Sequence, residues 1–367
     1  MREGPGGPTS GSDVTEDRRR ATLWLFLACL SLLAGCGEDK GTVPEDGSPI
    51  LDTLMISVDE FPTMFVPPDN PITRQGADLG RRIFFDPILS GDSTQACGDC
   101  HKPEFSFSDA GERFSRGIDG ILGNRNAPSL PNAGWLRFLT WDGKARSLEE
   151  QAVTPVESIV EMHSVWDDVV AKFRRHPQYP ALFRDVFGTG EVTQDLILKA
   201  IAQFERTFVS NNSRYDRWRR GEGDLTEEER RGHDLFFTER GDCFHCHPNG
   251  LFADGLFHNI GLETELIDEG LGTVTQDPYD RGKFKTPTLR NVLFTAPYMH
   301  DGRFATLEDV LDHYNGNAVT SPNVDPLIRV DSGLGLSDRE KEQLIAFLKT
   351  LTDSSFVQNP EYRNPNE

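Results

Sequence analysis

The chain has 367 residues, and its 59 acidic residues outnumber its 38 lysines and arginines, which gives a formal net charge of −21 at pH 7. A surface this negative disfavours nucleic acids and anionic lipid surfaces as partners and suits a basic redox partner. The length suffices for two domains of roughly 150 residues, each able to bury its own core.

Residues 1–35 have the pattern of a signal peptide, with three arginines (18–20) before an apolar run that is short for a membrane-spanning helix. The run ends in Leu33-Ala34-Gly35-Cys36, which resembles the bacterial lipoprotein signal, in which the cysteine is lipidated. An ordinary cleaved signal and an uncleaved anchor are the alternatives. Because Gly37 is not the aspartate that resembles an inner-membrane retention signal, we expect a periplasmic protein anchored through Cys36 to the outer membrane.

Two copies of one short motif carry the chemistry of the chain. Cys97-Gly-Asp-Cys100-His101 and Cys243-Phe-His-Cys246-His247 each place two thiols three positions apart, with a histidine directly after the second. This pattern is typical of covalent c-type haem attachment, in which the thiols form thioethers and the histidine ligates iron. A zinc site is the alternative, but structural zinc pairs usually lie ~15–20 residues apart, whereas most of the chain separates these two. The sequence therefore predicts two haems, with His101 and His247 as iron ligands.

The two motifs belong to an internal repeat. The matched segments, first and second copy in turn, are 80–85 and 232–237, 126–130 and 285–289, 141–144 and 300–303, and 147–150 and 306–309. In both copies a proline and an aspartate stand 14 positions apart, at Pro128 and Asp142 and again at Pro287 and Asp301. Several matches in one register predict two homologous haem domains.

We place these domains at residues 71–215 and 216–355, after a flexible tether (36–70) rich in Gly, Pro, Asp and Ser and before a tail (356–367). The first haem domain is expected to react with small molecules and the second to transfer electrons. The predicted fold is mainly α, with two cytochrome c-like haem domains and long loops.

Helix signals mark the main elements of this fold. A first helix is expected from near Thr73, and a second from Thr226, where Glu229 completes a capping box. Residues 192–208 carry apolar side chains at helical spacing and predict a core helix at the domain boundary. A last helix is expected from Ser337 to Leu351, and no segment has a convincing strand pattern.

The repeat also predicts which iron is open to small molecules. Tyr314 lies 14 positions after His300 and offers an oxygen that can ligate ferric iron. Its counterpart in the first copy is Pro155, 14 positions after Trp141, which has no side-chain ligand. We therefore predict an open distal face at the first iron, and Tyr314 as the second ligand of the other iron. Met299 and His313 remain the alternatives to Tyr314.

Two polar residues near Pro155 in the sequence suit bound peroxide. Gln151 and Glu161 are of the type needed there, because a carboxylate can take a proton from the near oxygen and return it to the far one. Without a neighbouring haem, Glu161 fits a solvated surface carboxylate equally well.

From about Pro71 to Leu351 the chain resembles the bacterial dihaem cytochrome c peroxidase and MauG family. The matching motifs are the two haem motifs, Arg125-Asn-Ala-Pro128, Trp141-Asp-Gly143, Glu161-Met162, Pro287-Thr-Leu-Arg-Asn291 and Pro297-Tyr-Met-His-Asp-Gly302. The resemblance implies that Trp141 lies between the haems as an electron bridge and that electrons enter through the second haem.

The resemblance also assigns the pocket and a metal site. It implies that Gln151, Pro155 and Glu161 line the open pocket. It further implies a calcium ion held by the Asn126 side chain and by the Thr295 and Pro297 carbonyls, since oxygen ligands suit calcium.

The sequence departs from the peroxidase pattern in two places. Peroxidases of the family usually carry a histidine that closes the first iron until the other haem is reduced, but no histidine occurs here between His101 and His163. They also usually have methionine where Tyr314 stands, and a tyrosine at that position resembles MauG.

We therefore expect a cytochrome-c-peroxidase-type oxidoreductase that reduces hydrogen peroxide to water. Its expected partners are hydrogen peroxide and a small electron-donor protein such as a cytochrome c or a cupredoxin. A second copy of the chain, in a homodimer, is a further candidate partner. MauG-like oxidation of residues on a partner protein is one alternative function. A dihaem electron carrier or redox sensor without turnover is the other.

Overall fold

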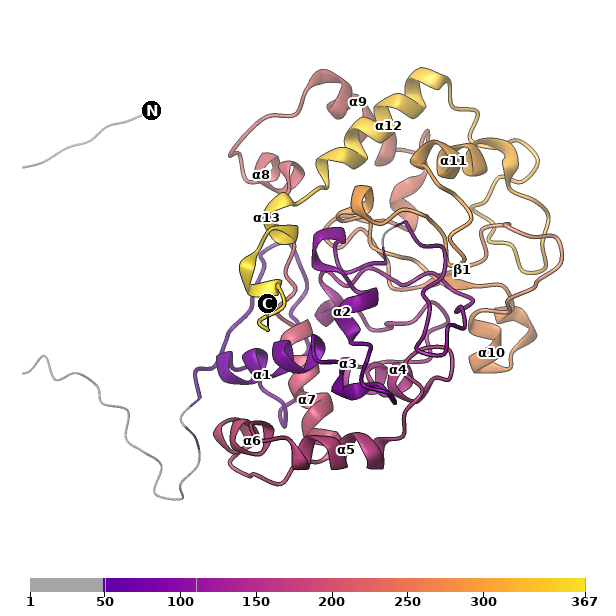
Figure 1. Ribbon diagram of the computed structural model, residues 1–367. Coiled ribbons are helices and arrows are strands. Elements are labelled where there is room, and N and C mark those ends of the chain that lie inside the picture. Colours follow the sequence, from indigo (N-terminus) through magenta and orange to yellow (C-terminus); the bar gives the residue numbers. More distant parts are fainter. Residues whose placement is uncertain (1–48, 50, 110, 367) are drawn as a thin grey trace, which may run out of the picture. The chain divides into compact units, whose positions relative to one another are not determined.

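The computed structural model describes residue 49, residues 51–109 and residues 111–366, which all belong to one compact unit (Figure 1). The expected signal peptide, Cys36 and the first part of the tether lie outside the described residues. None of the described helices is long and apolar enough to cross a membrane.

The described part of the chain is mainly helical, as the sequence predicts. Its α-helices are α1 (Arg74–Phe84), α2 (Cys97–Cys100), α3 (Leu148–Gln151), α4 (Val153–Glu157), α5 (Trp166–Arg175), α6 (Tyr179–Phe187), α7 (Gln194–Glu205), α8 (Arg214–Arg219), α9 (Glu227–Phe236), α10 (Leu271–Thr275), α11 (Leu307–Asp312), α12 (Asp338–Thr350) and α13 (Ser354–Val357). Short 3-10 turns occur at Pro87–Leu89, Pro103–Phe105, Ala133–Trp135, Cys243–His245, Pro278–Asp280, Val292–Phe294 and Pro360–Tyr362, and a π-helical turn at His313–Asn317. Two short strands, β1 (Phe257–His258) and β2 (Phe284–Lys285), pair antiparallel.

Side-chain caps confirm the expected helix starts. Thr73 precedes α1 and accepts a hydrogen bond from a first-turn amide, and Thr226 forms the expected capping box with Glu229 at the start of α9. Ser337 caps α12 in the same way. Each cap satisfies amides that have no acceptor within the helix. The core helix expected in residues 192–208 is α7, which is buried along most of its length.

Two helix pairs repeat one close crossing (Figure 1). Where α1 crosses α7, a β-carbon on Gly80 would lie 1.9 Å from the Ala200 carbonyl oxygen. Where α9 crosses α12, a β-carbon on Gly232 would lie 1.9 Å from the Gln343 carbonyl oxygen. Only glycine allows the two backbones to approach this closely. The matched crossings show that α12 is the repeat counterpart of α7, an equivalence that the matched sequence segments do not include.

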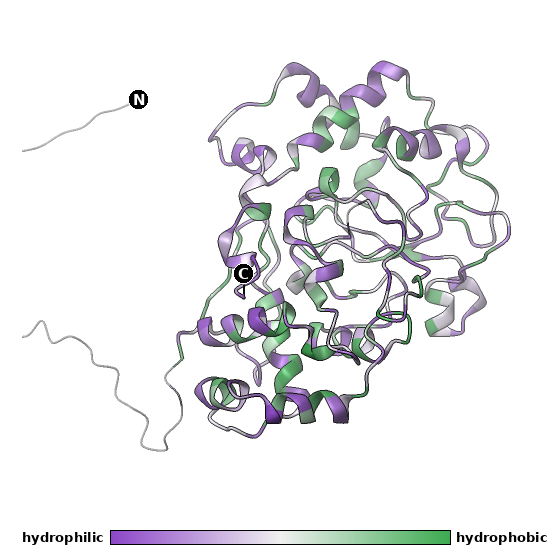
Figure 2. Cartoon of the chain, viewed as in Figure 1, coloured by the Kyte–Doolittle hydropathy of each residue, from purple (hydrophilic) through white to green (hydrophobic). Residues whose placement is uncertain are grey.

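The apolar side chains gather in two main clusters, one in each half of the chain. The first is centred on Leu79, Ile83, Phe84, Phe107, Phe173, Phe183, Ile201, Phe204 and Phe208. The second is centred on Tyr215, Phe236, Phe252, Leu344, Phe347, Leu348 and Leu351. In Figure 2, hydrophobic residues mark α7, whereas the start of α12 is hydrophilic. Phe356, Val357 and Tyr362, beyond the predicted boundary at residue 355, pack into the first cluster.

Candidate haem sites

The histidines of the two motifs are held in the same way. His101 Nδ1 lies 2.8 Å from the Phe107 carbonyl oxygen, and His247 Nδ1 lies 2.8 Å from the Phe252 carbonyl oxygen. Because a carbonyl only accepts, Nδ1 carries the proton in both rings, which leaves the Nε2 lone pair free for iron. Burial lowers the pKa of both histidines and so favours the neutral form that ligation requires.

The four motif cysteines are all unpaired thiols. Burial raises the pKa of Cys100 to about 11 and the pKa of Cys243 to about 12. Zinc requires thiolates that converge on one point. Among the described residues, however, no group of candidate metal ligands contains more than one of the four sulfurs. Two separate sites, each with two thiols and a histidine, fit haem c and not a four-thiolate zinc centre.

A cavity adjoins the second motif and is lined by residues from both halves of the chain. Its lining includes Cys243, Cys246, His247, Trp141, Lys285, His300, Met299, Tyr314, Leu344 and Leu348. No described residue makes a hydrogen bond to the Tyr314 hydroxyl, and burial raises the pKa of Tyr314. His313 is held differently, because its Nε2 lies 2.9 Å from the Ile260 carbonyl oxygen. Of the three candidate second ligands, Tyr314 and Met299 thus line the cavity.

The candidate open pocket at the first motif is built by α3, α4 and the turn that follows them. Gln151 ends α3, and Pro155 lies one turn later in α4. The turn brings Glu161 back, since the adjacent Met162 amide donates a 3.1 Å hydrogen bond to the Pro155 carbonyl. The negative charge of Glu161 helps to raise the pKa of both Cys97 and Cys100, although burial is the largest cause for each.

Burial is also the main influence on Glu161 itself. It raises the pKa of Glu161, and a hydrogen bond from Ser158 opposes that shift. His163, the next histidine in the sequence after His101, is half exposed, and its Nδ1 lies 2.5 Å from Asp119. The His163 imidazole therefore already has a carboxylate partner.

Trp141 lies in the wall of the second cavity. Its indole N–H donates a 2.8 Å hydrogen bond to the Asn126 carbonyl, and the Asn126 amide donates a 2.7 Å hydrogen bond to the His300 carbonyl. The Lys285 ammonium lies 5.9 Å from the indole ring, and burial lowers the pKa of Lys285 to about 8. Trp141 and its repeat counterpart His300 are thus joined through the backbone of one residue. The His300 ring stacks on the Phe284 ring, with 3.6 Å between the ring centroids.

Comparison with known proteins agrees with two haem-attachment sites in this chain. A family model described as di-haem cytochrome c peroxidase matches residues 74–224. The methylamine utilization protein MauG of Methylophilus methylotrophus is 36% identical over 287 residues, which cover 78% of this chain and 84% of that protein. The chain belongs to the dihaem cytochrome c peroxidase and MauG family. Two c-type haems at the two motifs follow from this membership.

Other relatives and solved structures agree with this membership. The cytochrome c551 peroxidase of Nitrosomonas europaea is 34% identical over 311 residues, covering 82% of this chain and 86% of that protein. The crystal structure of a MauG-like protein associated with microbial copper homeostasis has a TM-score of 0.78 and 37% identity, covering 85% of this chain and 99% of that chain. The diheme peroxidase BthA of Burkholderia thailandensis has a TM-score of 0.70 at 25% identity, covering 86% and 97%.

The three residues expected to bind calcium in this dihaem protein lie around one cavity. Asn126, Thr295 and Pro297 all line the space beside the second motif. No described residue donates a hydrogen bond to the Asn126 side-chain oxygen or to the other two carbonyls. Calcium takes about six to eight oxygen ligands, so water would have to complete the set.

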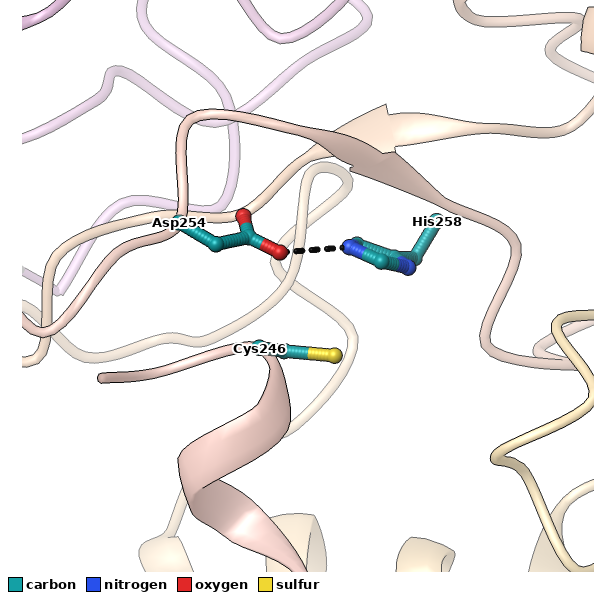
Figure 3. A group of neighbouring side chains, drawn as sticks. All are labelled: Cys246, Asp254 and His258. Carbon is teal, nitrogen blue, oxygen red and sulfur yellow. Dashed lines mark hydrogen bonds and ion pairs between the residues drawn. The ribbon is translucent and has the colours of Figure 1, made fainter.

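The motifs in the sequence do not include His258, which the structure places beside the second haem motif. His258 lines the second cavity next to Cys246, with Nε2 2.8 Å from Asp254 and Nδ1 2.6 Å from Asp325 (Figure 3). The Asp254 carboxylate, with the Cys246 thiol and Asp325, raises the pKa of His258 to about 11. A thioether at Cys246 removes the thiol contribution and leaves an imidazolium between two carboxylates. In the sequence, the only signal for this pair was the spacing of four residues between Asp254 and His258, shortly after the second haem motif.

Proposed function

We propose that this chain is a periplasmic peroxidase that reduces hydrogen peroxide to water at the haem attached to Cys97 and Cys100. The observation that carries this proposal is the arrangement at the first motif, where Pro155 occupies the repeat position of Tyr314 and the charge of a half-buried carboxyl, Glu161, acts on both attachment cysteines. Electrons enter through the second haem from a small cytochrome c or cupredoxin.

Glu161 moves the protons in this proposal. Its carboxylate takes a proton from one peroxide oxygen and returns it to the other, so that water becomes the leaving group. Burial raises the pKa of Glu161, which brings its proton affinity closer to the range in which it can both hold and release a proton near neutral pH. Gln151 orients peroxide through its amide. When bound, the haem supplies the electrons and the iron to which peroxide binds.

Tyr314 would hold the iron of the other haem together with His247. Its position in the cavity wall with a hydroxyl that no described residue binds supports this assignment over His313, whose Nε2 faces a carbonyl. An anionic oxygen ligand stabilises ferric iron and lowers the reduction potential relative to methionine. Trp141, in the wall of the same cavity, is the proposed electron bridge between the haems.

MauG-like oxidation of residues on a partner protein is the second candidate function. Tyr314 favours it, because a tyrosine at this position resembles MauG, and a low-potential second haem is a poorer acceptor for electrons from ordinary cytochromes c. The 36% identity to a MauG protein agrees with this alternative.

The proposal also includes a membrane anchor and a bound metal ion. Lipidation of Cys36 would anchor the protein to a membrane, in particular the outer membrane, and mass spectrometry of the mature N-terminus tests it. A soluble mature chain that starts beyond Cys36 would remove the anchor. One calcium ion at Asn126, Thr295 and Pro297 is tested by elemental analysis of the purified protein, and a calcium-free active protein would contradict it.

Steady-state turnover separates the two candidate functions. We expect the purified dihaem protein to consume peroxide continuously with reduced cytochrome c or a reduced cupredoxin, and Glu161→Gln to lose this activity. Glu157→Gln, which changes an exposed carboxyl of α4, is the matched control and should keep it. Reaction with peroxide but no turnover with either donor would contradict the peroxidase proposal and support the MauG-like alternative.

A further inference from the structure

Glu205, at the end of α7, is a buried acid that the proposed peroxide chemistry does not use. Glu205 is only 5% exposed, and no described residue donates a hydrogen bond to its Oε2. An ionised carboxylate without a partner is costly to bury, so a group in this position usually changes its protonation state or serves a function.

The nearest positive charge is already paired with another acid. Arg206 binds Glu149 of α3 through two hydrogen bonds of 2.8 and 2.9 Å, and Asn70 donates a third hydrogen bond, of 2.7 Å, to Glu149. Arg206 still favours ionised Glu205, but the Glu149 charge opposes it, and burial outweighs both. Burial raises the pKa of Glu205 to about 8.

Most of the remaining charged groups on the helices around Glu205 have partners elsewhere. On α1, Arg74 pairs with Asp52, Arg81 donates to two carbonyls of the C-terminal segment, and Asp78 and Arg82 lie near these two arginines. On α3, Glu150 accepts a hydrogen bond from the Arg146 amide. On α7 itself, Lys199 pairs with Asp69 and Asp195.

Glu205 follows Phe204, a member of the apolar cluster against which Cys97 of the first haem motif packs. Its charge is the strongest influence from any other residue on the buried Cys97 thiol, whose pKa is raised chiefly by burial. A thioether at Cys97 does not titrate, so in the dihaem protein the adjacent redox-active group is the haem itself.

The internal repeat supports this placement independently. The crossings at Gly80 and Gly232 align Ala200 with Gln343, and the next contacts there, to Phe204 and Phe347, keep the same register. One residue further, Glu205 therefore corresponds to Leu348, which lines the cavity of the second motif. The first site thus has an acid at a position where the second site has an apolar wall residue.

We propose that Glu205 is a redox-linked proton site of the first haem. When that haem accepts one electron from the donor, the Glu205 carboxylate takes one proton from solvent and becomes a carboxylic acid. When the electron leaves, the same proton is released. The physical reason is that an added electron and a carboxylate repel each other strongly in a buried site, and protonation removes the repulsion. The proposal rests on a haem at the first motif but not on which substrate is oxidised there.

The test is a spectroelectrochemical titration of the first haem at several pH values between about 6 and 10. Because reduction raises the proton affinity of Glu205 further, the midpoint potential should stay level where Glu205 is protonated in both redox states and fall as pH rises above about 8, by up to about 59 mV per pH unit, the value for one proton per electron. In Glu205→Gln and in Glu205→Leu, which installs the residue type of the second site, this fall should disappear. Glu191→Gln, with a side chain that is 75% exposed just before α7, should keep it.

A second readout identifies the proton carrier directly. Infrared difference spectra recorded on reduction should show a carboxylic acid C=O band that shifts in heavy water and is absent from Glu205→Gln. An unchanged pH slope in Glu205→Gln, or a wild-type potential that does not depend on pH, would overturn the proposal. Glu161→Gln should lose peroxide turnover and keep the pH slope, so failure of the proposed peroxidase function would not be mistaken for failure of this inference.

Discussion

The indole N–H of Trp141 donates a 2.8 Å hydrogen bond to the backbone carbonyl of Asn126. The Asn126 amide in turn donates to the His300 carbonyl at 2.7 Å. These two bonds fix the plane of the indole in the wall of the second cavity, at the place where the two copies of the repeat meet. The structure therefore presents a large oxidisable ring held rigidly beside one haem site, as an electron bridge requires.

Replacing this ring tests the bridge. Trp141→Phe should leave peroxide binding in place and slow electron transfer between the haems by about tenfold or more, equivalent to about 1.4 kcal/mol on the barrier, because phenylalanine is harder to oxidise and lacks the indole N–H. Stopped-flow spectra that follow the second haem after peroxide is added measure this rate. Trp135→Phe is the control, since Trp135 makes a similar 2.8 Å hydrogen bond to the Pro62 carbonyl away from the cavity. Equal rates in the two variants would mean that electrons take another route.

The proton-transfer role of Glu161 predicts a large kinetic effect. Glu161→Gln should lower the rate of the reaction with peroxide by ~10²–10⁴-fold, the usual contribution of a positioned acid or base, with both haems intact. Rapid mixing with peroxide measures the rate, and a value within about threefold of wild type would reject the assignment.

The same carboxyl predicts a pH dependence. The reaction begins with the carboxylate, and burial raises the pKa of Glu161, so the active form is lost on acidification at a higher pH than for an exposed glutamate. The wild-type rate should therefore fall as pH decreases below neutral, whereas the residual rate of Glu161→Gln should lack this limb. A pH–rate profile of both proteins checks this prediction, and the same limb in both would exclude Glu161 as its source.

Much of the site was predictable because its signals are local. The spacing of Cys97, Cys100 and His101 is set by the haem, and caps such as Thr226 with Glu229 are encoded within four residues. Features that depend on distant segments were not predictable. His258 pairs with Asp325, which lies 67 residues further along the chain, and the equivalence of α7 and α12 appears only in the backbone approach at Gly80 and Gly232.

The burial of Glu205 escaped sequence reasoning for a related reason. Residues 192–208 have a helical apolar pattern, and in that pattern a glutamate next to an arginine reads as part of a solvated face. The structure instead pairs Arg206 with Glu149 of α3, which leaves Glu205 buried without its own counter-ion.

The identity of the second axial ligand can be read from variant spectra. Tyr314→Met should raise the midpoint potential of the second haem, because a neutral thioether stabilises ferric iron less than an anionic phenolate. Met299→Leu, at the alternative ligand that also lines the cavity, should leave the low-spin spectrum unchanged. Redox titration and electron paramagnetic resonance check both. If Met299→Leu lost the low-spin signal of the second haem and Tyr314→Met kept it, Met299 and not Tyr314 would be the second iron ligand.

A buried ion pair should dominate the stability of the second half of the chain. Arg290 and Asp216 are 0% and 2% exposed and form two hydrogen bonds of 2.9 Å. Arg290→Leu should lower the free energy of unfolding by about 3–5 kcal/mol, because it leaves Asp216 buried without its partner. Arg231→Leu, which breaks an exposed ion pair with Glu227, should leave the midpoint of thermal unfolding nearly unchanged. Thermal unfolding of the dihaem protein measures both, and equal effects would contradict the argument.

The central claim is that the first haem is open in the fully oxidised protein, because Pro155 offers no ligand and no histidine lies between His101 and His163. The most direct test is stopped-flow mixing of fully ferric protein with hydrogen peroxide. We expect an immediate change in the haem spectrum without prior reduction. A ferric protein that stays inert until one haem has been reduced would contradict it.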